Sequence, residues 1–331
     1  MLEKINQIIK QNHLIRKGDT IIVALSGGPD SVCLAHILWR LQKKLGIELV
    51  LAHLNHNLRG KESDADSRFV QKLALKLNLT LGSKKLNNKP TNEAAAREAR
   101  YTFLEQVRKK HHGQSIAVAH TADDQVETIL LNFLRGAGLS GLSGMRFKNN
   151  FIIRPLLTCR HEEILAYLKE NHLSYCRDSS NLDLKYTRNR IRHKLLPLLE
   201  KEYNPKIRKN ILKLAETIHF AQDYIQEQAK AIINQNSQSF PLKEWQKLPY
   251  ILKSEVLRQM IAVAGGGLQD IYAVHLAEVV KMLESPRGNK KKNLPHRLQI
   301  LKKNGRIFLT SGNGLIQTRL QKMVRPNSII C

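Results

Sequence analysis

A glycine-rich turn carries the strongest chemical signal in this sequence. It is Ser26-Gly27-Gly28-Pro29-Asp30-Ser31, which follows the apolar run Thr20–Leu25 and precedes a predicted helix. Two glycines allow a tight turn that exposes backbone N–H groups, and the helix N-terminus adds a positive dipole end. With the hydroxyl groups of Ser26 and Ser31, the turn is suited to a phosphate or a pyrophosphate.

Three familiar glycine loops are excluded at this turn. It lacks the Gly-Lys-Ser/Thr ending of a Walker A loop, and it is neither Gly-x-Gly-x-x-Gly nor Gly-x-Ser-x-Gly. A hydrolase nucleophile is therefore not expected here. The structural alternative is an ordinary glycine turn with a Ser or Asp cap.

A pair of carboxylates follows another predicted strand, Ser115–Ala119. Asp124 and Glu127 are three residues apart in a predicted helix over 123–134, so they share one helix face. In a doubly wound fold, ligands bind at the carboxyl ends of the strands, where both the turn and this helix begin. We therefore expect the two carboxylates near the phosphate-binding turn.

Composition favours a soluble protein with a polyanionic partner. The 331 residues include 54 Lys and Arg against 28 Asp and Glu, a net charge of +26, so nucleic acid is the favoured partner. No uncharged apolar run approaches the ~18 residues of a membrane span, and the N-terminus shows no secretion signal. No Cys-x-x-Cys pair exists among Cys33, Cys159, Cys176 and Cys331, which disfavours zinc and iron–sulfur sites and favours a reduced, cytoplasmic location.

Strands and helices alternate through the first 200 residues. The predicted strands are 20–25, 49–54, a third from 79, 115–119 and a fifth around 152–153, and the predicted helices are 31–44, 62–78, 92–110, 123–134 and 160–171. This alternation predicts an α/β fold with a doubly wound, mostly parallel sheet and helices on both faces.

The composition changes after about residue 195. Helices are predicted over 207–234, 252–264 and 271–283, and short strands over 298–301 and 307–309. The basic run Lys290-Lys291-Lys292 is interpreted as a solvated loop. We expect a catalytic domain over 1–200, a helical polyanion-binding domain over 201–285 and a small C-terminal β region over 286–331.

The glycine turn resembles the pyrophosphate loop of the N-type ATP pyrophosphatases, which cleave ATP between the α- and β-phosphates. Together with later motifs over residues 20–200, the sequence resembles the tRNA(Ile)-lysidine synthetase family. Those motifs are His53-Leu54-Asn55-His56-Asn57-Leu58-Arg59, Glu93-Ala94-Ala95-Ala96-Arg97 with Arg100-Tyr101, 119–128, 135–138 with Gly141-Leu142, Arg154-Pro155-Leu156, Asp178, Asn181, Arg188-Asn189 and Arg192. The chain departs from the family pattern at Thr121, where many members carry a second His, and at Cys176, where an aromatic residue is common.

The resemblance implies a two-step reaction with ATP and Mg²⁺ as cofactors. ATP adenylates the carbonyl oxygen of the wobble cytidine in an isoleucine tRNA with a CAU anticodon. The ε-amine of free L-lysine then displaces AMP and gives lysidine, which changes decoding from AUG to AUA. The implied partners are this tRNA and free L-lysine, and the sequence is compatible with a homodimer.

The resemblance also assigns roles to the acidic residues and to the nucleotide-binding residues. Asp124 and Glu127 are expected to bind the lysine ammonium and to help it lose a proton. Asp30 and Asp123 are expected to orient Mg²⁺ or the reacting groups. The residues expected to bind the nucleotide are Ser26, Gly27, Gly28, Pro29, Asp30, Ser31, His53 and His120.

Basic residues complete the expected site, each with a structural alternative. Arg97 and Arg100 lie within one helical turn and are suited to developing phosphate charge, or else form a solvated helix face. The stretch from Arg188 through Asn189 and Arg192 to Lys194 is expected to bind substrate, with tRNA backbone contacts favoured over a solvated face. For His53 and His120 the alternative is a structural role in the core or at a cap.

Two rival functions remain open at this point. One is another tRNA-modifying or small-acid enzyme of the same superfamily, such as a tRNA thiolase, against which the scattered cysteines and the charge of +26 argue. The other is a non-catalytic RNA-binding protein, against which the intact Asp30, Asp124 and Glu127 argue.

Overall fold

The structure is a computed structural model that describes residues 1–58, 60–176, 184–234, 239–263, 271–286, 288–311 and 314–315. The motif residues Arg59, Asp178 and Asn181 lie outside this set. The chain divides into two compact units, Met1–Thr217 and Ile218–Cys331, with the division inside one helix. The expected domain limits at residues 200 and 285 stay a prediction.

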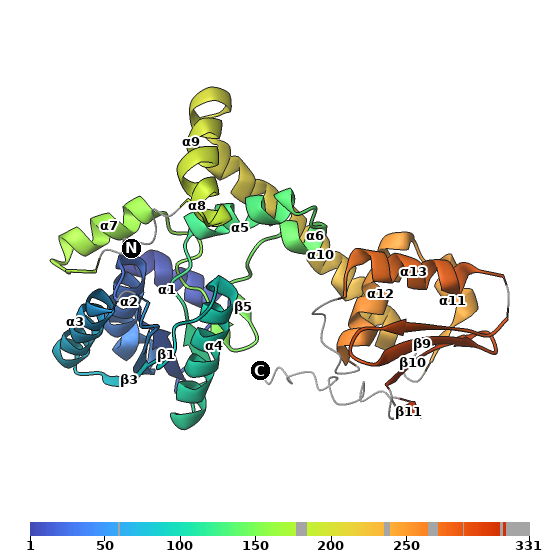
Figure 1. Ribbon diagram of the computed structural model, residues 1–331, viewed down its shortest axis with the longest axis horizontal. Coiled ribbons are helices and arrows are strands. Elements are labelled where there is room, and N and C mark those ends of the chain that lie inside the picture. Colours follow the sequence, from blue (N-terminus) through green and yellow to red (C-terminus); the bar gives the residue numbers. More distant parts are fainter. Residues whose placement is uncertain are drawn as a thin grey trace. The chain divides into compact units, whose positions relative to one another are not determined.

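Unit 1, coloured blue to yellow in Figure 1, is built on a six-stranded sheet whose strand order is β3-β2-β1-β4-β6-β5. All neighbouring strands are parallel except the edge pair β5 and β6. The strands are β1 (Thr20–Ala24), β2 (Glu48–Asn55), β3 (Thr80–Lys85), β4 (Ser115–Ala117), β5 (Lys148–Asn149) and β6 (Ile152–Ile153). The predicted α/β fold with a mostly parallel sheet is thus confirmed.

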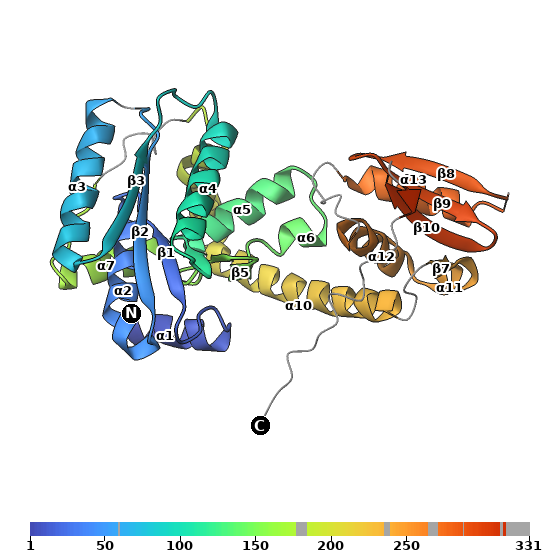
Figure 2. The same cartoon turned by 90° about the horizontal axis from the view of Figure 1, so that it is seen from below.

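Helices cover both faces of this sheet because its strand residues alternate between two buried clusters. Ile21 and Val23 pack with α1, α2, α3 and α7, whereas Ile22 packs with α4 (Figure 2). Strand side chains point alternately to the two faces, so a sheet buried on both sides needs the unbroken apolar run that β1 has. These helices are α1 (Leu2–Gln11), α2 (Pro29–Leu45), α3 (Lys61–Leu77), α4 (Glu93–Lys110) and α7 (His161–Glu170).

A third group of helices packs beside the sheet and brings the basic stretch to the acidic helix. Val126 and Ile129 of α5 form one buried cluster with Ile191, Leu196 and Ile211. Sequence reasoning predicted no helix over 187–203, which here forms short α and π turns. The elements are α5 (Ala122–Leu134), α6 (Leu139–Leu142), α8 (Thr187–Arg190), η2 (Ile191–Leu195), α9 (Leu196–Leu198), η3 (Leu199–Tyr203) and α10 (Ile207–Asn234).

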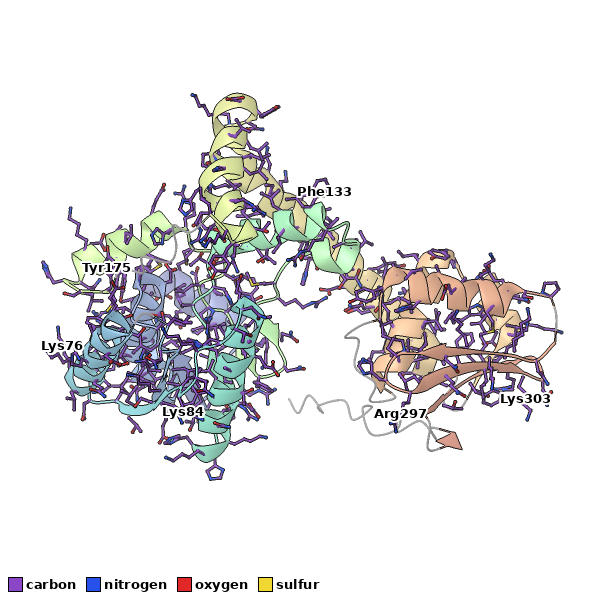
Figure 3. All side chains as sticks on the ribbon, viewed as in Figure 1. Lys76, Lys84, Phe133, Tyr175, Arg297 and Lys303 are labelled. Carbon is purple, nitrogen blue, oxygen red and sulfur yellow. The ribbon has the colours of Figure 1, made fainter. Side chains whose placement is uncertain are left out.

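Unit 2 packs helices against an antiparallel sheet in the order β11-β10-β9-β8, with β7 paired to β10. Figure 3 marks Arg297 and Lys303 at the two ends of β9. Asn304 and Gly305 both have positive φ, 50° and 68°, as a two-residue hairpin between β9 and β10 requires. The elements are β7 (Phe240–Pro241), α11 (Leu242–Lys247), α12 (Tyr250–Val263), α13 (Ala273–Glu284), β8 (Lys290–Leu294), β9 (Leu298–Lys303), β10 (Arg306–Ser311) and β11 (Gly314–Leu315).

The interpretation of Lys290-Lys291-Lys292 as a loop is wrong, because these residues form most of strand β8. Lys292 reaches Glu278 of α13 at 2.8 Å, and the strand ends in the buried Leu294. Long lysine stems lie along the sheet while their charged ends stay near solvent, so a basic run is compatible with an edge strand. Within the described residues, no helix is both long and apolar enough to cross a membrane.

Replacement of Ile300 tests the core of unit 2. Ile300 lies on β9 with no exposed surface, so Ile300→Ala should destabilise unit 2 by about 2–5 kcal/mol. Trp39 belongs to unit 1 and Trp245 to unit 2, and the sequence has no other Trp. Urea unfolding in a Trp39→Phe background, followed by Trp245 fluorescence, measures the change. The exposed Lys291→Ala is the control, and an equal effect of both substitutions would contradict the assigned core.

Candidate active site

The reversal of strand order places two helix N-termini side by side. Strand β1 pairs with β4, with Ile21 opposite Ser115, and the sheet continues away from this pair in both directions. Helix α2 begins after β1 and helix α5 after β4, both at the carboxyl ends of these strands. Ligands of doubly wound folds bind in the crevice at this reversal. The phosphate-binding turn and the acidic helix therefore meet where a nucleotide is expected.

Ser31 organises the glycine turn. The backbone N–H groups of Ser26 and Gly27 each donate to Ser31 Oγ at 3.2 Å, and Ser31 Oγ donates to the Gly28 carbonyl at 2.9 Å. Gly27 has a φ of +94°, and Gly28 is the N-cap of α2 with Pro29 in its first turn. The turn thus exposes the N-terminal N–H groups of a 17-residue helix, which are donors suited to phosphate oxygens.

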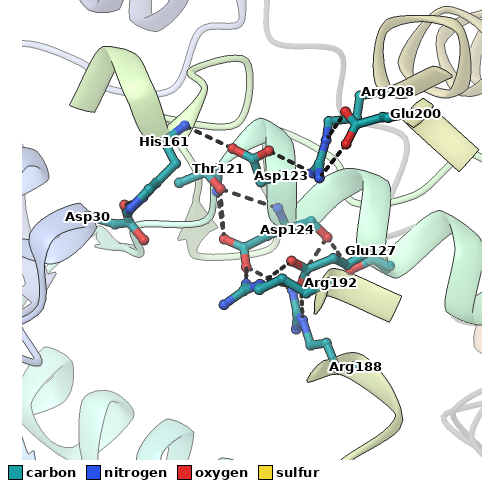
Figure 4. Close-up of polar contacts among 11 residues, drawn as sticks. Asp30, Thr121, Asp123, Asp124, Glu127, His161, Arg188, Arg192, Glu200 and Arg208 are labelled. Carbon is teal, nitrogen blue, oxygen red and sulfur yellow. Dashed lines mark hydrogen bonds and ion pairs between the residues drawn. The ribbon is translucent and has the colours of Figure 1, made fainter. Parts of the chain in front are cut away.

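Asp124 and Glu127 lie together, as predicted, and two arginines hold them (Figure 4). Glu127 accepts from Arg188 Nε at 2.7 Å and from Arg192 at 2.5 and 3.1 Å, and its side chain is only 1% exposed. Asp124 Oδ1 accepts from Arg188 Nη2 at 2.9 Å, and the Asp124 side chain is 18% exposed. Two carboxylates and two guanidinium groups therefore form a compact cluster with no net charge, which we call the four-ion cluster.

The four-ion cluster changes the environment expected for the basic stretch. Sequence reasoning favoured contacts of Arg188 and Arg192 with the tRNA backbone, yet both guanidinium groups pair with buried or half-buried carboxylates. Planar guanidinium groups suit this paired geometry better than ammonium groups would. Asn189 lies between them on α8, and Arg190 bonds the hydroxyl of Thr187 at 3.0 Å.

Thr121 fixes the start of α5. Its hydroxyl accepts from the Asp124 backbone N–H at 3.3 Å, and the Asp124 carboxylate accepts from the Thr121 N–H at 2.9 Å. This reciprocal pair is a capping box, which satisfies two N–H groups that the helix leaves open. The departure from the family pattern at Thr121 thus gives a residue that orients Asp124.

A second row of contacts links the two helix N-termini. His161, the first residue of α7, contacts Asp30 Oδ1 through its ring Nδ1 at 3.2 Å and donates its backbone N–H to Asp123 Oδ2 at 2.8 Å. Arg208 of α10 donates to Asp123 Oδ1 at 3.1 Å and pairs with Glu200 at 2.7 Å. The hydrogen bond to Asp30 raises the pKa of His161 above its ordinary value.

The two acids expected to meet Mg²⁺ differ in how well they fit it. Magnesium in nucleotide sites takes one or two carboxylates together with phosphate oxygens. Asp30 fits, because it belongs to the glycine turn and no described residue bonds its second carboxylate oxygen. Asp123 fits less well, because both of its oxygens already accept hydrogen bonds. Among the described residues, no three His, Cys, Asp or Glu side chains gather into a metal site.

His53 has a supporting position in place of the expected direct nucleotide contact. It is 4% exposed, and its two ring nitrogens lie 2.8 Å from the Leu25 carbonyl and 3.1 Å from Ser67 Oγ. Since a carbonyl only accepts, Nδ1 carries the proton. Burial lowers the pKa of His53, so the ring is a neutral link that holds the residue just before the turn.

His120 is held as a neutral hydrogen-bond donor. Arg154 Nε donates to His120 Nδ1 at 3.3 Å, which leaves the ring proton on Nε2. Burial is the main cause that lowers the His120 pKa to about 4. Arg97 lies over the Tyr101 ring at 5.1 Å and interacts electrostatically with His120. Arg100, in the same helical turn as Arg97, interacts electrostatically with His56 instead.

Sequence reasoning missed His161, Arg208 and Glu200. His161 follows Arg160 at the start of a helix that was predicted, and a helix N-terminus after a strand end was the available signal. Arg208 gave no such signal, because it lies 85 positions from its partner Asp123. Arg154 was part of a quoted motif but had no assigned role.

The fold and this site define a PP-loop ATP pyrophosphatase. In agreement, residues 1–199 match the PP-loop domain family. The chain belongs to the tRNA(Ile)-lysidine synthase family. A tRNA(Ile)-lysidine synthase of Dehalococcoides mccartyi (strain CBDB1) is 38% identical over 320 residues, which cover 90% of this chain and 68% of the relative. One of Clostridioides difficile (strain 630) is 33% identical over 94% of this chain and 71% of its own length.

A solved structure shares the fold. It is the U34-tRNA thiolase NcsA from Methanococcus maripaludis with its [4Fe-4S] cluster, at a TM-score of 0.53 and 19% identity. The match covers 65% of this chain and 77% of the thiolase. At this identity, the likeness concerns the fold alone.

Substitution of the two turn glycines separates backbone strain from packing. Gly27→Ala should cost about 1–2 kcal/mol, because its positive φ is strained for any residue with a Cβ atom. Gly28→Ala should change stability little, because the added Cβ meets only Ser26 Oγ at 3.6 Å. Urea unfolding measures both variants, and equal costs would contradict the described turn.

The His120 pKa predicts how stability depends on pH. The folded pKa of about 4 lies below the ordinary value of 6.5, so the folded state favours neutral His120. This stability is present above pH 6.5 and is lost as the pH falls from 6.5 towards 4. Between pH 7.5 and pH 5, the melting temperature of His120→Gln should therefore fall by less than that of the wild type. Parallel losses in thermal melts would argue against a buried neutral ring.

Proposed function

We propose that this chain joins free L-lysine to the wobble cytidine of the CAU-anticodon isoleucine tRNA, with cleavage of ATP to AMP and pyrophosphate. Membership of the lysidine synthase family supports the reaction. The single structural observation that carries the proposal is the four-ion cluster, whose two acids lie on the first two turns of α5. Its carboxylates and guanidinium groups offer partners for the two charged ends of an amino acid, which supports a lysine site near the one we propose for ATP.

The first step activates the cytidine. Its C2 carbonyl oxygen attacks the α-phosphorus of ATP, the bond to the β-phosphate oxygen breaks, and pyrophosphate leaves. The backbone N–H groups of Asp30 and Ser31, in the first turn of α2, bind the departing phosphates. Mg²⁺ held by Asp30 and the phosphates would neutralise their charge. Arg97 and the Nε2 proton of His120 supply donors from neighbouring elements for developing oxygen charge.

The second step brings the lysine amine to the activated base. The ε-nitrogen bonds to C2 of the cytidine, the C2–oxygen bond breaks, AMP leaves, and the nitrogen gives up protons. Asp124 is the acid we assign to the ammonium group, because it is more accessible than Glu127. Glu127 holds Arg188 and Arg192, so that one guanidinium group can turn to the lysine carboxylate while the other still balances the buried acid.

The tRNA is held by general positive charge outside the four-ion cluster. The net charge of +26 favours RNA, and Arg190 and Lys194 of the basic stretch take part in no ion pair with described acids. Phosphate contacts position the tRNA without reading its sequence. We place the reaction in the cytoplasm, where the tRNA and free lysine meet.

A tRNA thiolase is the second candidate, since a thiolase shares the fold. Cys33 and Cys159 are fully buried in the core of unit 1, and burial raises the pKa of Cys33 beyond the physiological range and that of Cys159 to about 11. Neither thiol is in a state to act as a nucleophile. The relatives found at 33–38% identity are lysidine synthases, which favours ligation of lysine.

Labelling of tRNA with lysine tests the proposal. Radiolabelled lysine should enter an isoleucine tRNA transcript with a CAU anticodon only when ATP and Mg²⁺ are present, and should not enter the methionine tRNA with the same anticodon. Asp124→Asn should raise the KM for lysine by about tenfold or more, because it removes the charge that meets the ammonium group.

The control variant is Glu216→Gln, an exposed acid on α10. Pyrophosphate release without labelling would mean that the nucleophile is wrong. Tight tRNA binding without pyrophosphate release and without lysine labelling would favour the alternative that the chain is a non-catalytic RNA-binding protein.

A further inference from the structure

His161 lies between two acids that the reaction needs close together. Asp30 belongs to the first turn of α2, and Asp123 to the first turn of α5. Neighbouring carboxylates repel each other and their oxygens accept hydrogen bonds, so a group between them must carry donors toward both. His161 does so with two different N–H groups, from its ring and from its backbone (Figure 4).

The two contacts of His161 serve different purposes. The backbone N–H bond to Asp123 at 2.8 Å holds the first residue of α7 in place whatever the side chain is. The ring contact to Asp30 at 3.2 Å depends on the side chain alone. Since a carboxylate only accepts, the ring nitrogen donates and so limits the directions that the Asp30 carboxylate can take.

Asp123 is itself anchored from a third element. Its other oxygen accepts from Arg208 Nη1 at 3.1 Å, and Glu200 holds the opposite edge of the same guanidinium group at 2.7 Å. The contacts therefore run in series from Arg208 through Asp123 and His161 to Asp30. All of these residues lie in unit 1.

We propose that His161 is a positioning residue that aims Asp30 at the magnesium–nucleotide pair, and that Asp123 and Arg208 anchor it. This inference rests on the proposed function in one respect, the meeting of Asp30 with Mg²⁺ and ATP. Asp123 then acts through His161 and not as a metal ligand. The exposed fractions, 49% for His161 and 29% for Arg208, mean that both side chains can be replaced without opening the core.

The test measures how much Mg²⁺ the protein needs in order to bind ATP. Binding of a fluorescent ATP analogue is titrated with Mg²⁺ in the absence of tRNA. His161→Ala should raise the half-saturating Mg²⁺ concentration by about tenfold, the effect of one charge-assisted hydrogen bond. At saturating Mg²⁺ the affinity for ATP should return to the wild-type value. His161→Asn should restore most of the loss, because its amide N–H lies near the position of ring Nδ1. Glu162→Ala, which removes an 82% exposed neighbour, is the control.

Arg208→Met tests the anchor. It should raise the Mg²⁺ requirement by a smaller factor, and should add nothing in the His161→Ala background, because contacts in series are not additive. Three outcomes would overturn the proposal. The effects of Arg208→Met and His161→Ala on the Mg²⁺ requirement could add in the double variant, or His161→Ala could leave that requirement unchanged. The third outcome is a loss of ATP binding that persists at saturating Mg²⁺. Lysine labelling of tRNA by the wild type is measured separately. If no label were incorporated, the proposed function would be refuted, while the ATP-binding measurements would still decide whether His161 positions Asp30.

Discussion

Charge balance around the start of α5 is the constraint on which the site depends. The helix presents Asp123, Asp124 and Glu127 within two turns, and Glu127 is almost fully buried. A buried carboxylate without a partner would cost several kcal/mol. Arg188, Arg192 and Arg208 therefore have to come from later segments, and the hydrophobic cluster around Val126 and Ile191 brings those segments to the helix. Packing and electrostatics thus require the same arrangement of the chain.

Most of unit 1 could be predicted because its signals are local. Strand β1 is a continuous apolar run, and the turn after it has glycines where the backbone needs them, so both were predicted within a residue or two. Asp124 and Glu127 were expected on one face because helix spacing is fixed. The expectation that the glycine turn and the acidic helix lie near each other followed from the general rule for ligand sites in doubly wound sheets.

The parts that sequence reasoning missed depend on distant partners. Whether an arginine meets a carboxylate or solvent is decided by packing, so Arg188 and Arg192 were expected on tRNA phosphates. His53 has its ring nitrogens occupied by Leu25 and Ser67, which no spacing rule predicts. Lys290–Lys292 is a strand because neighbouring strands pair with it, although its composition is that of a loop.

The two π turns between α8 and α10 have a consequence for chain length. A π turn holds one residue more than an α turn, and each residue of an α-helix rotates the chain by about 100°. Deletion of one residue from η2 would turn Leu196 away from Val126 and Ile129 of α5 and displace the segment that leads to Arg208. Insertions and deletions in this segment are therefore constrained as strictly as the charged residues themselves, and the number of residues between Arg192 and Arg208 is part of the site.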